Sequence, residues 1–150
     1  MRVSLDTNIL VYAADATAEQ RHSRAVDLIN RAVGADCVLT LQSLGEFYNV
    51  ATRKVGLAAG KTESFVNAWR SCFPVHAASA SCLDEAMHAV RRHRLPFWDA
   101  MLWAAAREAG CRLLLSEDFQ DGLAIGGLRC VNPFAAANRA LLEAALPSPD

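Results

Sequence analysis

The feature that most constrains the fold of this chain is the alternation of short apolar runs with longer segments of helical periodicity. The apolar runs predict strands at residues 2–5, 37–41, 74–77, 112–116 and 128–131. The segments between them predict a helix or turn at 9–14 and helices at 16–33, 43–54, 61–72, 81–93, 97–109 and 133–146. Strands that alternate with helices predict an α/β fold with a mostly parallel central sheet and helices on both faces.

Length and composition set further limits. The chain has 150 residues, of which 53% are hydrophobic and 21% charged, and its formal net charge is −1. These values predict one domain over residues 1–146, followed by a short disordered tail at 147–150. A net charge near zero argues against a globally basic nucleic-acid-binding protein, so any basic surface must be local.

The cysteines and the first residues indicate a cytoplasmic protein. The five cysteines are scattered and form no C-x-x-C pair, which favours buried apolar thiols in a reducing cytosol over disulfides or zinc. Asp6 interrupts the first apolar run, so no signal peptide is expected. The sequence has no apolar stretch of the length that a membrane span needs, and no membrane association is expected.

Four acidic residues fall where the strands of such a sheet end. Asp6 follows the first strand, and Glu46 lies in the first turn of the helix after the second. Asp99 lies in the first turn of the helix that leads into the strand at 112–116, and Asp118 follows that strand. In open α/β sheets the functional crevice lies outside the carboxyl ends of the strands. We therefore expect the four carboxylates to meet at one edge of the sheet.

Asp6 also has a local structural explanation. It could be a turn residue, or it could cap the helix that follows. Thr7 or Asn8 could take the capping role instead, because their side-chain oxygens can accept from unpaired amides of the first helical turn.

The other acids have local explanations too. Ser43 and Glu46 have the spacing of a capping box. Asp99 in a first turn would complement the helix dipole. Asp118 and Asp121 could be loop formers. Each explanation is reasonable alone, but all of them holding at once is far less probable than a shared function.

The residue types indicate which ion such a cluster would bind. Four like charges packed together would raise one another's pKa values and lower stability unless a cation offsets them. The candidate ligands are all hard oxygen donors with no His or Cys among them, which favours Mg²⁺ or Mn²⁺ over zinc. Such an ion lowers the pKa of a bound water and neutralises charge at a phosphodiester. The pattern predicts metal-assisted phosphodiester hydrolysis with water as the nucleophile.

Four short blocks carry a resemblance to a known family. They are Leu5-Asp6-Thr7-Asn8, Ser43-Leu44-Gly45-Glu46, Pro96-Phe97-Trp98-Asp99-Ala100 and Leu115-Ser116-Glu117-Asp118-Phe119. In this order and spacing the chain resembles the PIN-domain ribonucleases, over residues 2 to about 134. Single-domain members of this size are mostly the VapC-type toxins of type II toxin–antitoxin systems.

The resemblance implies a three-layer α/β/α sandwich and Mg²⁺- or Mn²⁺-dependent endoribonuclease activity. It also implies a homodimer, and inhibition by a cognate antitoxin protein whose tail enters the acidic groove. By position, Asp6, Glu46 and Asp99 match the family's acidic triad, and Asp118 matches its fourth, more variable acid. Asp6, Asp99 and Asp118 are the metal ligands that the resemblance implies.

Other polar residues of the blocks match supporting positions. Asn8 and Ser116 match residues that orient metal-bound waters. Glu117 stands beside Asp118 and Asp121 follows it, so either could share the role of the fourth acid.

The sequence says less about the substrate. Arg91, Arg92 and Arg94 form the one basic cluster, a few residues before Asp99, and are candidates for contact with RNA phosphates. Cations at a helix carboxyl end, which the dipole favours, are the alternative.

The large aromatic side chains favour a structural interpretation. Trp69, Trp98, Trp103 and Phe47 fall at helical spacing. We expect core or dimer contacts for them in preference to platforms on which bases stack.

Two other functions compete with the nuclease. A phosphoryl-transfer domain could use Asp6 as nucleophile or phospho-acceptor. It would need a second acid two residues later or directly beside Asp6, where the chain has Asn8 and Thr7. A non-catalytic module of the same fold that binds RNA or protein would be supported by a missing acid, yet all four acids are present. The sequence therefore favours the metal-dependent endoribonuclease.

Overall fold

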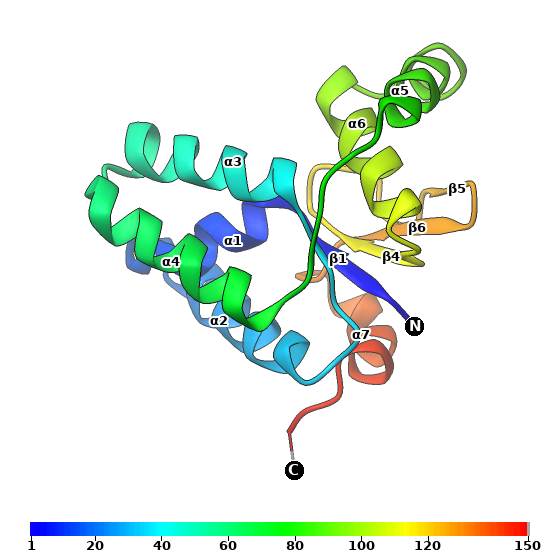
Figure 1. Cartoon of the computed structure of the whole chain (residues 1–150). Helices are drawn as coiled ribbons and strands as arrows, with labels where there is room; N and C mark the ends of the chain where they lie inside the picture. Colours follow the sequence, from blue (N-terminus) through cyan, green and yellow to red (C-terminus); the bar gives the residue numbers. More distant parts are fainter. Residues whose placement is uncertain (150) are drawn as a thin grey trace.

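The computed structural model describes residues 1–149 (Figure 1). Its strands are β1 (Val3–Leu5), β2 (Leu39–Thr40), β3 (Val75–His76), β4 (Leu113–Leu115), β5 (Ala124–Ile125) and β6 (Leu128–Val131). β1, β4 and β6 are parallel neighbours in that order, and β5 pairs antiparallel with β6. β2 and β3 form a parallel pair, which a bridge between Val3 and Cys37 places beside β1. The prediction of a mostly parallel central sheet is confirmed.

Seven α-helices surround the strands in the described residues. They are α1 (Thr7–Ala14), α2 (Gln20–Val33), α3 (Leu41–Val50), α4 (Ala59–Cys72), α5 (Ala80–His93), α6 (Phe97–Glu108) and α7 (Arg139–Ala145). Short 3-10 turns lie at Ala16–Ala18 and Ala136–Asn138, and a π-helical turn follows α3 at Ala51–Val55. Figure 1 shows α1 to α4 on one side of the sheet and α5 with α6 on the other.

The side chains of β4 explain why helices cover both faces. Leu113 and Leu115 pack into a core with side chains of α1 to α4 and α7. Leu114, between them, packs into a second core with side chains of α5 and α6. Successive residues of a strand point to opposite faces, so a strand with three consecutive leucines is buried on both sides. The three-layer α/β/α arrangement follows.

Several predicted boundaries are wrong for local reasons. The helix predicted at 16–33 is interrupted by Glu19, whose φ of 54° leaves a separate 3-10 turn before α2. The strand predicted at 37–41 is shorter, because Thr40 caps α3 and Leu41 already belongs to that helix. The helix predicted at 133–146 is limited to α7, which is preceded by a turn at 132–134 and the 3-10 turn at Ala136–Asn138.

The remaining features concern the thiols and the carboxyl end. All five cysteines are free thiols, and Cys72 is the exposed one. No helix among residues 1–149 is long and apolar enough to cross a membrane. Residues 147–149 of the predicted tail have no regular structure, and Asp150 lies outside the described residues.

Candidate active site

The register of the sheet brings Asp6 and Ser116 together. Leu5 of β1 pairs with Leu115 of β4, so the next residue of each strand lies at the same carboxyl edge. The Asp6 amide donates to the Leu115 carbonyl at 2.9 Å. The Ser116 hydroxyl donates to Asp6 Oδ2 at 2.6 Å. Asp6 therefore stands at the edge that the sequence predicts, in contact with the neighbouring strand.

Asp6 is also the amino-terminal cap of α1. Its Oδ1 accepts from the Thr7 amide at 2.6 Å, so the alternative caps Thr7 and Asn8 are wrong. The Asp6 residue is only 4% exposed. Burial raises the pKa of Asp6 to about 6, although the hydrogen bonds from Ser116 and Thr7 lower it; the nearby acids Asp118 and Asp99 add to the rise.

Glu46 reaches the same edge from the second turn of α3. Thr40 is the cap of this helix, because its hydroxyl accepts from the Ser43 amide at 3.1 Å. The predicted capping box is therefore wrong, since Ser43 lies inside the helix. Glu46 Oε2 accepts from the Thr7 hydroxyl at 2.9 Å, and Oε1 accepts from Gln42 Nε2 at 2.8 Å. These two bonds fix the carboxylate against α1.

Asp99 and Asp118 complete the set. Asp99 lies in the first turn of α6, as predicted, and is half-buried. Burial raises the pKa of Asp99, and the charges of Asp118 and Glu46 raise it further. Asp118 is exposed, and its amide donates to Ser116 Oγ at 3.0 Å. The Ser116 hydroxyl therefore links the Asp118 backbone to the Asp6 carboxylate.

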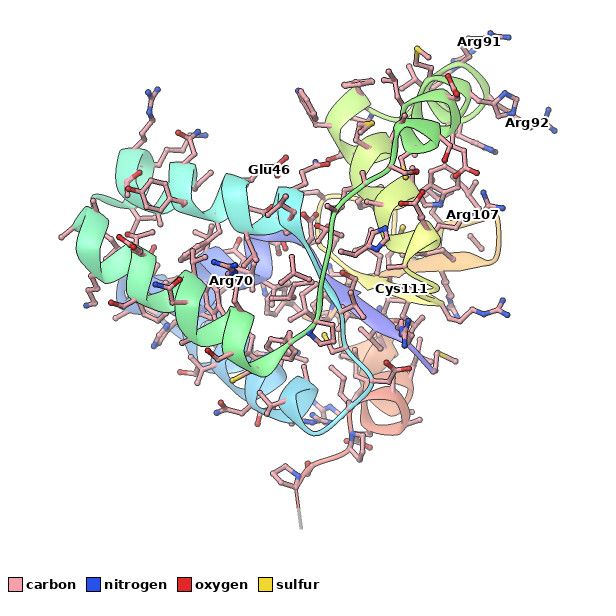
Figure 2. The ribbon with its side chains drawn as sticks, in the orientation of Figure 1. Glu46, Arg70, Arg91, Arg92, Arg107 and Cys111 are labelled. Carbon is pink, nitrogen blue, oxygen red and sulfur yellow. The ribbon has the colours of Figure 1, made fainter. Side chains whose placement is uncertain are left out.

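The four acids line one pocket of about 300 Å³. Its walls come from α1, α3, α6 and the loop after β4, and consist of Asp6, Thr7, Asn8, Val11, Tyr12, Glu46, Val50, Asp99 and Asp118. Figure 2 shows Glu46 on the part of α3 next to α6. Within the described chain, none of the four carboxylates forms an ion pair with Lys, Arg or His. The pocket therefore concentrates negative charge without a protein counter-ion.

A larger cavity of about 510 Å³ lies between α2 and α7, and its arginines make structural contacts. Arg24 of its lining donates to the carbonyls of Pro133 and Phe134, and Arg31 donates to the Leu146 carbonyl. These arginines attach the carboxyl-terminal segment to α2. The cavity is therefore not a second candidate for the chemistry.

The pocket fits a hard divalent cation in its donor chemistry. All of its ionisable ligands are carboxylates, and Asn8 Oδ1, which is buried at its wall, has no hydrogen-bond partner. Among residues 1–149, no three His, Cys, Asp or Glu side chains are already close enough together to enclose one ion. Mg²⁺ needs only one or two carboxylates and retains several waters, so a complete cage is not required.

The supporting residues predicted from sequence separate into two groups. Asn8 and Ser116 lie at the site, with Asn8 Nδ2 3.5 Å from Ser116 Oγ. Asp121 does not line the pocket. Its carboxylate accepts from the Asn132 amide at 2.8 Å and from the Asn138 side chain at 3.0 Å, and these bonds lower its pKa. These contacts hold the segment between β6 and α7 and give no support to a catalytic role.

Glu117 does not line the pocket. It accepts a hydrogen bond from the Tyr12 hydroxyl and forms an ion pair with Arg21 at 3.3 Å. Arg21 also stacks over Phe134, with its guanidinium carbon 4.3 Å from the ring centroid. Asp118, the neighbour of Glu117, lines the pocket instead. The geometry therefore favours Asp118 over Glu117 as the fourth acid.

Three residues of the site were missed as contributors to it. Thr7 and Gln42 hold Glu46, and Tyr12 forms part of the wall. The sequence does indicate a contact between Gln42 and Glu46, because residues four apart on a helix are neighbours. No local pattern identified Tyr12, whose partner Glu117 is more than one hundred residues away in the sequence.

The predicted basic cluster lies outside the pocket. Arg91, Arg92 and Arg94 are exposed at the carboxyl end of α5, and none of them lines the pocket. Figure 2 shows Arg91 and Arg92 projecting outward from that end. Their contact with RNA stays a prediction.

The comparison with protein families identifies the class of protein that this fold and site define. A family model described as "PIN domain" matches residues 3–120. The chain therefore belongs to the PIN domain family, as the four sequence blocks predict. No curated protein sequence matches the chain.

Solved structures extend the comparison over most of the chain. One is VapC20 of Mycobacterium tuberculosis, described as a sarcin-ricin loop cleaving toxin, with 20% identity, a TM-score of 0.63, and coverage of 77% of this chain and 89% of that one. A toxin–antitoxin complex from Klebsiella pneumoniae has 20% identity, a TM-score of 0.63, and coverage of 88% and 98%. DNA-bound VapBC from Salmonella typhimurium has 16% identity, a TM-score of 0.64, and coverage of 87% and 96%. At these identities the likeness shows the fold.

Proposed function

We propose that the chain is a metal-dependent endoribonuclease that hydrolyses RNA phosphodiester bonds with water as the nucleophile. The observation that carries the proposal is the meeting of four carboxylates, from four separate segments, in one pocket without a protein counter-ion. Structural acids are normally paired with a cation, whereas acids whose pKa values are raised by burial and by neighbouring like charges, as those of Asp6 and Asp99 are, are typical of a functional site. Membership of the PIN domain family points in the same direction.

Asp6, Asp99 and Asp118 are the residues that would hold Mg²⁺ or Mn²⁺. A bound ion of this kind would supply charge to a phosphodiester and lower the pKa of a water. Ser116 orients Asp6 by donating to its Oδ2 at 2.6 Å. In this proposal Asn8, whose Oδ1 lacks a partner, accepts from a water at the pocket wall.

Glu46 is the proposed acceptor of a proton from the attacking water. It lines the pocket from the side of α3, opposite the strand ends that carry Asp6. Thr7 and Gln42 each donate to one of its oxygens, which keeps the carboxylate in place while leaving lone pairs free. Its loss would therefore affect the reaction more than the fold.

The biological context is also a proposal. The similar structures include a sarcin-ricin loop cleaving toxin, a toxin–antitoxin complex and a DNA-bound VapBC. We infer that this chain is the toxin of such a pair in the cytoplasm, that it forms a homodimer, and that a cognate antitoxin protein blocks the acidic pocket. Arg91, Arg92 and Arg94 are the proposed contacts to RNA phosphates.

The test is cleavage of total cellular RNA by the purified chain with Mg²⁺, with Mn²⁺ and with EDTA. Asp99→Asn should abolish cleavage, whereas Asp84→Asn, which changes an exposed acid of α5, should leave it intact. Discrete cuts that need metal and vanish only in the Asp99 variant would support the nuclease. Folded, partner-free protein that cuts nothing would favour the non-catalytic interaction module, and cleavage that survives EDTA would reject the metal site.

A further inference from the structure

The acidic pocket creates a difficulty for a substrate that is a polyanion. Four carboxylates line it, and no Lys, Arg or His is among the described residues of its wall. A bound cation would offset charge at one point only. Affinity for RNA must therefore come from side chains next to the pocket.

The segment that leads from α5 into α6 carries side chains of two suitable kinds. Arg91, Arg92 and Arg94 are exposed at the end of α5, and Figure 2 shows the first two projecting outward. Phe97 and Trp98 begin α6, and their rings meet edge to face with centroids 5.0 Å apart. The segment thus places cations, then two aromatic rings, directly before Asp99.

Trp98 differs from the other tryptophans. Trp69 and Trp103 are 7% and 5% exposed and lie in the two cores, as predicted. Trp98 is 63% exposed, and Phe97 is 38% exposed. Of the two expected roles, the core contact is therefore wrong for Trp98, and the dimer contact stays a prediction. Exposed aromatic surface next to a functional site is typical of a surface that binds something.

Hydrogen bonds connect Trp98 to the pocket. Gln42 Nε2 donates both to the Trp98 carbonyl at 3.0 Å and to Glu46 Oε1 at 2.8 Å. The next residue after Trp98 is Asp99, which lines the pocket. The Trp98 backbone therefore lies beside the pocket, directly before a carboxylate that would face the scissile phosphate. The Trp98 ring does not line the pocket itself, so it would contact a part of the substrate that lies outside it.

We propose that Trp98, supported by Phe97, is a platform on which an unpaired nucleobase stacks while the neighbouring phosphodiester enters the acidic pocket. This rests on the proposed function and assigns to Trp98 the contact with an unpaired base, such as one in a loop or at an end of the RNA. A base in a duplex is already stacked on both faces, whereas an unpaired base can turn onto an exposed ring. Stacking does not depend on charge, which suits a site surrounded by carboxylates.

The three tryptophans make the proposal directly measurable. Trp98 is the exposed one, so quenching of intrinsic fluorescence by a ligand reports on this side chain. The full chain in EDTA, where no metal-dependent cutting occurs, is titrated with a single-stranded oligoribonucleotide of mixed sequence. A second titration uses an oligomer of equal length and charge that lacks bases. We expect quenching by the first and little by the second.

Substitutions separate stacking from packing. Trp98→Ala should weaken RNA binding by roughly 5- to 150-fold, which is the range that one stacked base contributes. Trp98→Phe should retain most of the affinity, because it keeps a ring. Tyr48→Ala is the matched control: Tyr48 is also exposed, but its position two residues from Glu46 places it on the other side of α3. It should leave binding unchanged.

Three outcomes would overturn the platform: equal quenching by the base-free oligomer, unchanged RNA affinity in Trp98→Ala, or duplex RNA binding as tightly as single strands. If Trp98→Ala instead alters self-association on size-exclusion chromatography without changing RNA affinity, the ring belongs to a contact between copies of the chain. The two proposals fail separately. Base-dependent quenching without metal-dependent cleavage would reject the nuclease alone, and cleavage with unchanged binding by Trp98→Ala would reject the platform alone.

Discussion

Two acidic regions of this molecule have opposite electrostatic character. Glu108, at the end of α6, contacts His76 Nε2 at 2.7 Å and accepts from the Ser79 amide at 3.0 Å and from the Ser79 hydroxyl. These hydrogen bonds lower the pKa of Glu108 to about 2. Asp6, in the acidic pocket, has its pKa raised to about 6, chiefly by burial. One carboxylate is stabilised in its charged form and the other is not.

The difference separates a structural acid from an acid that we propose to be functional. Glu108 joins β3 and the start of α5 to α6, and its partners are all supplied by the chain. The pocket acids have hydrogen bonds that orient them, yet lack any cation among the described residues. A protein tolerates such a cluster when an external cation completes it. The predictions below test this contrast.

The largest effect is expected for cleavage by Asp6→Asn. Asparagine can still cap α1 through its Oδ1, and its Nδ2 can donate to the Ser116 hydroxyl, but it lacks the charge that would hold the ion. We expect a loss of at least about 10²-fold in metal-dependent RNA cleavage, the scale that loss of metal-derived charge stabilisation produces. Cleavage rates measured under single-turnover conditions check this. Full activity would remove Asp6 from the mechanism.

The second prediction concerns the stability of the metal-free protein. The pKa of Asp6 is about 6 in the folded state, above its ordinary value of 3.8. The folded state therefore binds the proton more tightly, and stability falls as pH rises between about 4 and 6, by about 3 kcal/mol at most. In EDTA, Asp6→Asn should lack this fall and be more stable than the wild type at pH 7.

Urea unfolding at pH 4 and pH 7 measures this difference. The gap between variant and wild type should widen from the lower pH to the higher one, and Mg²⁺ should reduce it by stabilising the wild type. If Asp6→Asn is less stable than the wild type at pH 7 without metal, the charged Asp6 carboxylate does not destabilise the metal-free protein.

The third prediction compares two adjacent acids. Asp118 lines the pocket, whereas Glu117 is bound by Tyr12 and Arg21. Asp118→Asn should lower cleavage about 10- to 100-fold, the scale expected of a residue that tunes a metal site. Glu117→Gln should change cleavage less than about threefold and lower stability by about 1 kcal/mol. RNA cleavage and thermal melting are measured for both variants in parallel. A larger loss of cleavage in Glu117→Gln than in Asp118→Asn would identify Glu117 as the fourth acid.

The smallest effect is expected at the structural acid. Glu108→Gln should lower the melting temperature modestly at pH 7 and leave cleavage unchanged. Because the folded-state pKa lies below the ordinary value of 4.5, the stabilisation is present above pH 4.5 and is lost as pH falls toward 2. The difference between variant and wild type should shrink between pH 5 and pH 3. A loss of RNA cleavage would mean that the two acidic regions are coupled.

Much of the fold could be predicted from the strand at Leu113–Leu115 and its neighbours. Three buried leucines between helices are typical of a parallel strand covered on both faces. The end of this strand then predicts where the carboxyl edge of the sheet lies. The exact helix starts could not be predicted, because Thr40 and Ser43 both have capping side chains and the backbone geometry decides between them. Glu19 interrupts a helix through its own positive φ, which no periodicity reports.

The acids of the site could be predicted from the sequence, whereas the residues around them could be predicted less well. The positions of Asp6 and Asp118 follow from strand ends, which are sequence features. The roles of Tyr12 and Glu117 depend on a contact between distant segments, and the exposure of Trp98 depends on what packs around α6. Helical spacing places an aromatic ring on a face of its helix, but tertiary packing decides whether that face is covered.

The most direct test of the central claim is a calorimetric titration of the metal-free chain with Mn²⁺, repeated on Asp6→Asn and on Asp84→Asn. We expect saturable binding by the wild type and the Asp84 variant, and loss or strong weakening of that binding in the Asp6 variant. No saturable binding, or binding that is unchanged in Asp6→Asn, would show that the four carboxylates do not form a metal site.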